Sequence, residues 1–188
     1  RAHAFPTVPV EPTVLVLTHP LPPEALAELG RRWQEGVTAI TVPEQRWARC
    51  DIQSVSLLPN VLARQQAAEQ GAYEALFVRD GFVIEGSSSN LFAVIDGAVV
   101  TYPACNYILN GIARQRAIRH ARELGYTVLE QGIPLTALDR CQEMFVTSTT
   151  AEVMPVVAVD GKPVGDGRVG PVVRALQQAY RAAVEALG

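Results

Sequence analysis

The stretch Glu85-Gly86-Ser87-Ser88-Ser89-Asn90 lies between two apolar runs, Tyr73–Ile84 and Leu91–Ile95. Both runs are typical of strands, so the stretch predicts a corner where one strand ends and the next begins. Its glycine allows close approach of a ligand, and its acid and three hydroxyls supply polar groups at the same place. Two interpretations stay open here: a ligand site, or a solvated turn whose serines bond to the local backbone.

The segments around this corner predict an α+β fold. Residues 73–102 are expected to form a meander of three or four strands, with turns at Asp80-Gly81 and Asp96-Gly97. Residues 46–53 are expected to be extended, and Asn60 is expected to cap a helix that runs to about Gln70. Periodicity and flanking Pro and Gly predict the other elements: helices over 24–35, 112–124 and 171–187, a helical turn over 135–139, and strands over 13–18, 37–42, 127–129, 144–147 and 151–159.

Length and composition limit the class of protein. A chain of 188 residues with 48% hydrophobic residues and net charge −3 is one domain, or one and a fraction, with a core of its own. It has no basic stripe for nucleic acid and no apolar run long enough for a membrane. Three widely spaced cysteines without a CxxC pair indicate reduced thiols of a cytoplasmic protein, and neither a disulfide framework nor a metal site. The start at Arg1, without methionine, suggests a piece of something longer.

Three further features, like the serine run, place polar groups where a ligand could bind. Gly111 opens a predicted helix, whose unpaired N–H groups and positive dipole end suit a phosphate. Residues 147–150 place four hydroxyls where a strand ends. Arg1 and His3 flank an alanine, so in an extended segment their side chains point the same way and suit a carboxylate. Each feature alone is also ordinary: glycines often precede helices, hydroxyls often end strands, and polar residues often end chains.

Taken together, these motifs resemble the class IV (fold-type IV) pyridoxal-phosphate aminotransferases, and within them the D-amino acid (D-alanine) transaminases. The resemblance spans essentially all 188 residues, and its motifs in chain order are Arg-Ala-His (1–3), Arg-Trp-x-Arg-Cys-Asp-Ile-x-Ser (46–54), Leu-Leu-Pro-Asn (57–60), Glu-Gly-Ser-Ser-Ser-Asn (85–90), Leu-x-Gly-Ile (109–112) and Phe-Val-Thr-Ser-Thr-Thr (145–150).

The resemblance implies a fold, a reaction and a division of the chain. The fold is the C-terminal domain of that family, with mixed and antiparallel sheets and packed helices. The reaction moves an amino group between a D-amino acid, such as D-alanine, and a 2-oxo acid, with pyridoxal 5'-phosphate as cofactor and a homodimer as the working form. Residues 1–19 are then a remnant of a missing N-terminal domain, residues 20–24 a linker, and residues 25–188 the cofactor-binding domain.

Residue roles follow from the same resemblance. Glu85 matches the acid that pairs with the protonated pyridine nitrogen, and Leu109 matches the apolar residue against the ring. Arg1 and His3 match the pair that holds the substrate α-carboxylate at the site of the other subunit. The remaining expected cofactor contacts, the serines near the ring and the groups around the phosphate, are Ser87, Ser88, Ser89, Gly111, Ile112, Ala113, Ser148 and Thr149.

The chain departs from the family pattern in three places. Ala113 stands where the phosphate cup usually has a threonine, so one side-chain donor is lost. The N-terminal domain, which supplies a phosphate-binding arginine and a substrate tyrosine, is not part of these residues. Gln53 stands at the position of the Schiff-base lysine, and an amide is neither a nucleophile nor a base. The only lysine is Lys162, in a predicted hairpin turn with Asp160-Gly161.

Several alternatives stay open. Gln53 is either a change introduced into a working enzyme or the mark of a natural family member that has lost transamination. A second enzyme hypothesis is an aminodeoxychorismate lyase or a branched-chain aminotransferase, against which the Arg1-x-His3 pair argues. The third hypothesis is a non-catalytic module that binds pyridoxal phosphate without a covalent link.

Overall fold

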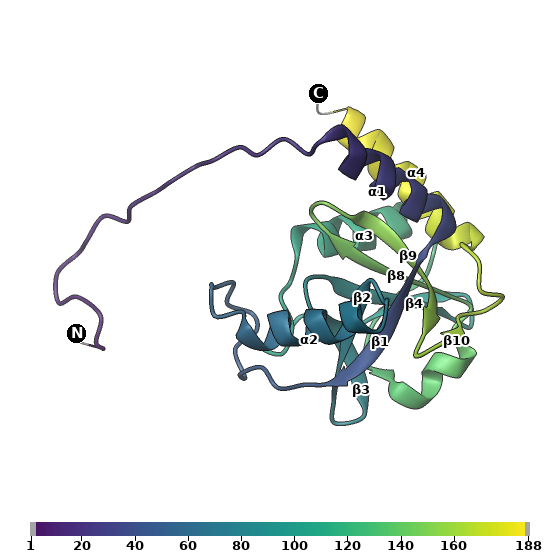
Figure 1. The fold of residues 1–188 in the computed structure, drawn as a ribbon, viewed down its shortest axis with the longest axis horizontal. Helices are drawn as coiled ribbons and strands as arrows, with labels where there is room; N and C mark the ends of the chain where they lie inside the picture. The colour runs from purple at the N-terminus through teal and green to yellow at the C-terminus, as the bar shows by residue number, and fades with distance from the viewer. Residues whose placement is uncertain (1–2, 187–188) are drawn as a thin grey trace.

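The computed structural model describes residues 3–186, whose ribbon is shown in Figure 1. In chain order the elements are α1 (Pro23–Glu35), β1 (Val37–Pro43), α2 (Leu58–Glu69), β2 (Glu74–Arg79), β3 (Phe82–Gly86), β4 (Asn90–Ile95), β5 (Ala98–Thr101), α3 (Ile112–Glu123), β6 (Val128–Glu130), β7 (Ile133–Pro134), the 3-10 helix η1 (Leu135–Arg140), β8 (Glu143–Ser148), β9 (Glu152–Val159), β10 (Lys162–Pro163) and α4 (Pro171–Glu185). The expected α+β class is confirmed.

Six of the strands close into a ring. The hydrogen-bonded order runs β4-β8-β9-β1-β2-β3, and β3 returns to β4 through the pair Glu85 and Asn90. Strand β1 is parallel to β2 and β9, whereas the other neighbours in the ring are antiparallel. The stretch 85–90 is therefore the corner that closes the ring, and its polar groups lie at the end of the barrel.

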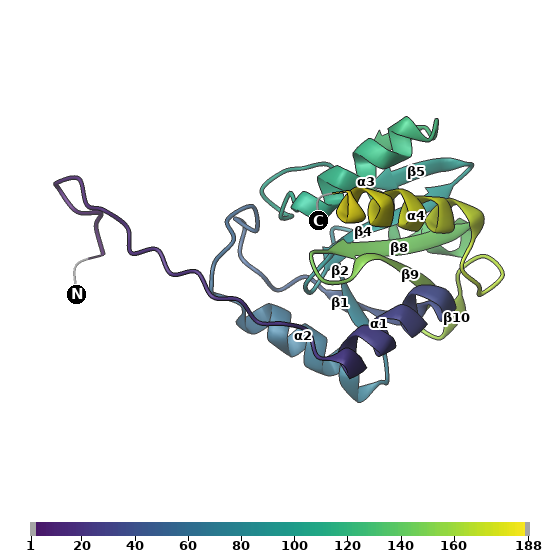
Figure 2. The same ribbon diagram turned by 90° about the horizontal axis from the view of Figure 1, so that it is seen from above.

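Helices cover the ring on two sides. Figure 2 shows the strands between α3 and α4 on one side and α1 and α2 on the other. An inner cluster of apolar side chains, which includes Leu76, Val146 and Met154, packs between the sheet faces. A second cluster contains the stacked rings of Phe92 and Phe145 beside α3 and α4, and a third packs under α2. Burial of these apolar faces stabilises the fold.

The Asp-Gly dipeptides form the expected tight turns. Asp80, Asp96 and Asp160 have φ near +50°, and each is followed by a glycine with φ between +74° and +80°. Two successive residues with positive φ suit the right-handed twist of a two-residue hairpin, and glycine adopts the second one without steric cost. These turns join β2 to β3, β4 to β5 and β9 to β10, so the predicted meander over 73–102 is confirmed as four strands.

Three local predictions are wrong. Residues 13–18 form no strand, because no strand of the described chain pairs with them, and Val14–Leu17 are 66 to 81% exposed. Residues 46–53 form bends and a turn in place of an extended segment. Asn60 lies inside α2 and does not cap it, because its side-chain Nδ2 donates to the Ser87 carbonyl oxygen at 2.7 Å.

Two boundaries bear on the predicted division of the chain. Helix α1 begins at Pro23, inside the expected linker over 20–24, and the division into remnant, linker and domain stays a prediction. The predicted end of the last helix at Leu187 lies outside the described residues, where α4 is followed to Glu185. No helix within residues 3–186 combines the length and apolar character needed to cross a membrane.

Candidate functional site

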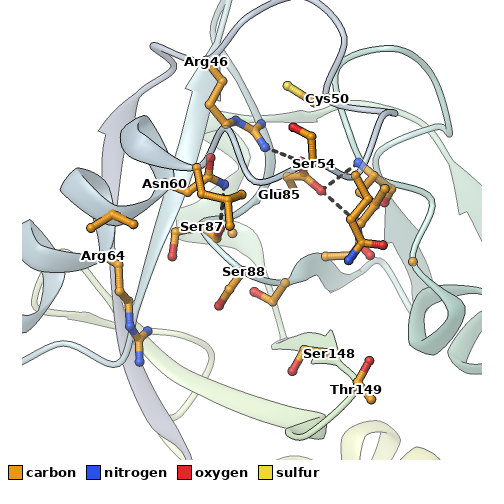
Figure 3. A pocket seen from close by; sticks show the side chains of 18 of the residues that line it. Arg46, Cys50, Ser54, Asn60, Arg64, Glu85, Ser87, Ser88, Ser148 and Thr149 are labelled. Carbon is orange, nitrogen blue, oxygen red and sulfur yellow. Dashed lines mark hydrogen bonds and ion pairs between the residues drawn. The ribbon is translucent and has the colours of Figure 1, made fainter. Parts of the chain in front are cut away.

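A cavity of about 590 Å³ opens at the ring-closing corner. Its wall comes from the loop after β1, from α2, from the corner between β3 and β4, from the start of α3 and from the end of β8 (Figure 3). This volume suits a small organic ligand. The structure brings together in this wall all the residues expected to contact a cofactor, together with Gln53: Glu85, Ser87, Ser88, Ser89, Leu109, Gly111, Ile112, Ala113, Ser148 and Thr149.

Glu85 is the buried acid of the cavity. Its carboxylate accepts hydrogen bonds from Arg46 Nη1 at 2.5 Å, Asn90 Nδ2 at 2.9 Å and the Leu109 N–H at 3.2 Å. Burial raises the pKa of Glu85 to about 7, while the charge of Arg46 opposes that rise. The ionised form of this buried carboxylate is stabilised by any ligand that brings a positive charge next to it.

Arg46 is shared between two buried carboxylates. Its guanidinium contacts Glu44 Oε2 and Glu85 Oε1, each at 2.5 Å, and lies over the Phe77 ring at 4.2 Å. Burial opposes the charge of Arg46, but the two acids together raise its pKa above the ordinary value, so it stays protonated. Burial of Glu85 therefore outweighs the effect of Arg46 on its pKa, and the charge of Glu44, which shares the same cation, adds a smaller increase.

The serine hydroxyls point to a second buried acid. Ser87 Oγ and Ser89 Oγ donate to Glu74 at 2.5 and 2.7 Å, and Ser88 Oγ lies 3.3 Å from it. The N–H groups of Ser87 and Ala75 also donate to Glu74. Gly86 is required here, since a Cβ would collide with Ser89 and Glu74. The carboxylate of Glu74 therefore fixes the shape of the corner.

The opposite part of the wall offers donors. Helix α3 begins at Ile112, and Gly111 in front of it provides no side-chain cap, so the first N–H groups stay available. The end of β8 contributes Ser148 and Thr149. Beside them, the hydroxyl of Thr147 is buried and has no hydrogen-bond partner among the described residues. Backbone donors at a helix start together with hydroxyls suit a phosphate.

The expected substrate pair does not reach this cavity within the described chain. His3 is exposed on the segment 3–22, which extends away from the body of the protein (Figure 1), and does not line the wall. Arg1 lies outside the described residues. The role of Arg1 and His3 at the site of another subunit therefore stays a prediction.

Sequence reasoning missed three polar residues of the site. Arg46 and Asn90 hold Glu85, and Glu74 holds the serines. The sequence does contain a signal for Glu74. It is the one charged residue in the run 74–78, whose other members are apolar, and a charged side chain in a buried strand needs polar partners. No local signal links Arg46 to Glu85, which lies 39 residues further along the chain.

Solved structures define the class of fold. The chain is similar to the branched-chain amino acid aminotransferase of Escherichia coli, with a TM-score of 0.72 and 35% identity over 78% of this chain and 52% of that one. It is also similar to the branched-chain amino acid aminotransferase of T.th., solved with N-(5'-phosphopyridoxyl)-L-glutamate, with a TM-score of 0.70 and 36% identity over 80% and 52% of the two chains. The expected fold, that of the fold-type IV aminotransferases, is confirmed.

Sequence comparison then gives the family. The family model for amino-transferase class IV matches residues 2–159, and the chain belongs to this family. It is 42% identical over 185 residues to the D-alanine aminotransferase of Staphylococcus aureus strain COL, a match that covers 98% of this chain and 64% of that protein. The chain thus spans just under two thirds of the length of this relative.

Proposed function

We propose that this chain binds pyridoxal 5'-phosphate and forms the cofactor-binding part of a D-amino acid transaminase. The observation that carries the proposal is the convergence of Glu85, Gly111 and Thr149 on one cavity. These groups come from positions far apart in the sequence, and they offer an acid on one part of the wall and anion donors on another. The S. aureus relative named D-alanine aminotransferase supports the substrate class.

The residues of the cavity fit such a cofactor. A phosphate accepts hydrogen bonds, and the start of α3 together with Ser148 and Thr149 donates them. The unpartnered hydroxyl of Thr147 is a buried donor in the same part of the wall. Ala113 has only its backbone N–H to offer, so this donor set is smaller than the family pattern by one hydroxyl.

Glu85 is the residue proposed to hold the ring nitrogen. When bound, the cofactor supplies an electron sink for the carbanion that forms at the substrate Cα. The ionised Glu85 keeps a proton on the ring nitrogen, because separating that ion pair in a buried site is unfavourable. Arg46 and Asn90 act as positioning residues, since they orient the carboxylate without being in the proposed contact.

Gln53 sets the limit on turnover. Its amide is in the cavity wall, but it is neutral and has no lone pair basic enough to take a proton from the substrate Cα. Lys162, the only lysine of the chain, lies in β10 and pairs with Asp139 at 3.4 Å, outside the cavity. We therefore propose that this chain holds its cofactor without a covalent bond and that transamination is lost.

Assembly and location belong to the same proposal. A homodimer would bring Arg1 and His3 of one copy to the cavity of the other, where they would hold the substrate α-carboxylate; within residues 3–186 of one copy, His3 does not line that cavity. The substrates are then an amino acid and a 2-oxo acid, and the location is cytoplasmic. A branched-chain aminotransferase is the alternative that the solved structures favour, whereas the relative named D-alanine aminotransferase, which matches 98% of this chain, supports D-amino acids.

The test compares the chain with its Gln53→Lys variant. Titration with pyridoxamine 5'-phosphate, followed by fluorescence, is expected to show saturable binding to both proteins. Pyridoxal 5'-phosphate is expected to resist dialysis only in the variant, because only lysine forms a covalent link. Transfer from D-alanine to 2-oxoglutarate is expected to rise above background only in the variant. Absence of saturable binding in both proteins refutes the proposal, and turnover with L-leucine in place of D-alanine favours the branched-chain alternative.

A further inference from the structure

Arg64 is a second arginine of the same cavity, and the proposed function gives it no role. It lies on α2, and its guanidinium stands on the other side of Ser88 from Ser148 and Thr149 in the view of Figure 3. Its position in the wall separates it from the donors assigned to the phosphate.

The guanidinium of Arg64 has unused hydrogen-bonding capacity. Its Nη1 is buried and has no hydrogen-bond partner among the described residues. The nearest acid oxygen, Glu74 Oε1, is 3.7 Å away and already accepts from Ser87 and from two backbone N–H groups. The Tyr73 ring at 4.7 Å supports the guanidinium, while the side chain is 41% exposed. Arg64 is thus held in place and reachable.

Arg64 differs in this respect from the other basic residue of the wall. Arg46 is engaged by Glu44 and Glu85 and is almost fully buried. Among the lining residues only these two are basic, so Arg64 is the cation that stays open to a ligand. An arginine binds a carboxylate through two parallel N–H donors, and such a bond is stronger in a partly dry cavity than in water.

We propose that Arg64 binds the side-chain carboxylate of an acidic amino acid or its 2-oxo acid, and so sets a preference for dicarboxylic substrates. This inference rests on the proposed function, because it takes the cofactor phosphate to lie near Ser148 and Thr149. Arg64 lines the same cavity from α2, on the other side of Ser88 from these hydroxyls (Figure 3), so it can meet the far end of a ligand that is anchored there. Arg64 is then a specificity residue that acts in binding and takes no part in proton transfer.

The test uses two stable adducts that differ in one charge. N-(5'-phosphopyridoxyl)-D-glutamate and N-(5'-phosphopyridoxyl)-D-glutamine have nearly equal size, and their affinities are measured by isothermal titration calorimetry. The wild-type chain is expected to bind the glutamate adduct about tenfold more tightly, the effect of one charge-assisted hydrogen-bond pair. Arg64→Gln is expected to remove this difference and to leave the affinity for the glutamine adduct within about twofold. Arg64→Lys is expected to keep part of the difference, and the exposed Arg140→Gln to keep all of it.

The outcomes separate this inference from the proposed function. Equal binding of the two adducts by the wild type overturns the role of Arg64 and leaves cofactor binding intact. The role of Arg64 is also overturned if Arg64→Gln lowers the affinity for both adducts equally while its melting temperature stays unchanged. In that case the arginine binds a group that both adducts share, such as the phosphate. If the wild type binds neither adduct, the proposed function fails, and the inference about Arg64 fails with it.

Discussion

Replacing Arg46 with glutamine is expected to destabilise the protein strongly at pH 8. The change leaves Glu44 and Glu85, whose side chains are 3 and 5% exposed, without the cation that both contact at 2.5 Å. Removal of one partner from a buried ion pair costs about 3–5 kcal/mol. A domain of this size is stable by roughly 5–15 kcal/mol, so the variant is expected to lose a large share of its free energy of unfolding.

The loss is expected to depend on pH in a definite direction. The pKa of Glu85 is about 7 in the folded protein, above its ordinary value of 4.5, so protonated Glu85 favours the folded state. The contribution of protonated Glu85 to the free energy of unfolding is complete below about pH 4.5 and disappears as the pH rises to 7. Arg46 lowers the pKa of Glu85, so without Arg46 this pKa rises further and the variant regains stability as acid neutralises Glu85. The difference between Arg46→Gln and wild type is therefore smaller at pH 5 than at pH 8.

Urea denaturation at pH 5 and pH 8, followed by circular dichroism, measures both quantities. Arg31→Gln is the matched control, because Arg31 also pairs with two acids, Glu28 and Glu35, but on the exposed face of α1. Arg31→Gln is expected to lower the free energy of unfolding only slightly, since exposed ion pairs contribute little to stability. A loss in Arg46→Gln no larger than in this control, or one that grows toward pH 5, would refute the charge-sharing account.

Two further substitutions test the corner and the helix start. Glu74→Gln replaces acceptor lone pairs with an NH₂ that faces serine and backbone donors, so chemical denaturation is expected to show a loss of about 2–3 kcal/mol; a neutral result would contradict the role of Glu74 as the acceptor that shapes the corner. Gly111→Ala places a Cβ 2.5 Å from Asn90 Oδ1, so it is expected to lower the free energy of unfolding by about 1–3 kcal/mol and to weaken binding of pyridoxamine 5'-phosphate. The control is Gly30→Ala in α1, where a Cβ meets no atom within 4 Å. This change is expected to raise the free energy of unfolding by up to about 1 kcal/mol. A stability of Gly111→Ala equal to that of wild type would contradict the close contact with Asn90.

Local signals predicted much of the fold. The Asp80-Gly81 and Asp96-Gly97 turns carry their own conformational preference, so the strands between them followed from neighbouring residues alone. The run over 13–18 has the same β-branched character, yet it forms no strand, because a strand also needs a partner and the described chain provides none. Local preference decides turns, whereas pairing depends on the rest of the molecule.

The candidate site was predictable as far as its motifs went. The sequence alone marks Glu85, the serines, Gly111 and Thr149 as groups at strand and helix ends, and the structure brings them to one cavity. Their partners are not predictable from local sequence, because Arg46 contacts Glu85 only once the ring of strands closes, and Asn60 donates from α2 to Ser87 in the corner between β3 and β4. The local sequence thus predicts Asn60 as a helix cap, whereas in the structure its side chain joins two segments that are distant in the sequence.

The proposed contact between Glu85 and the cofactor ring nitrogen is tested by a ¹⁵N NMR spectrum of pyridoxamine 5'-phosphate, labelled at that nitrogen and bound to the wild-type chain and to Glu85→Gln. If Glu85 holds the ring nitrogen, the wild type keeps this nitrogen in its protonated, upfield-shifted form at pH 8, and Glu85→Gln shifts the resonance to the neutral position. A bound cofactor whose ring nitrogen gives the same resonance in both proteins would contradict the placement of Glu85 at that atom.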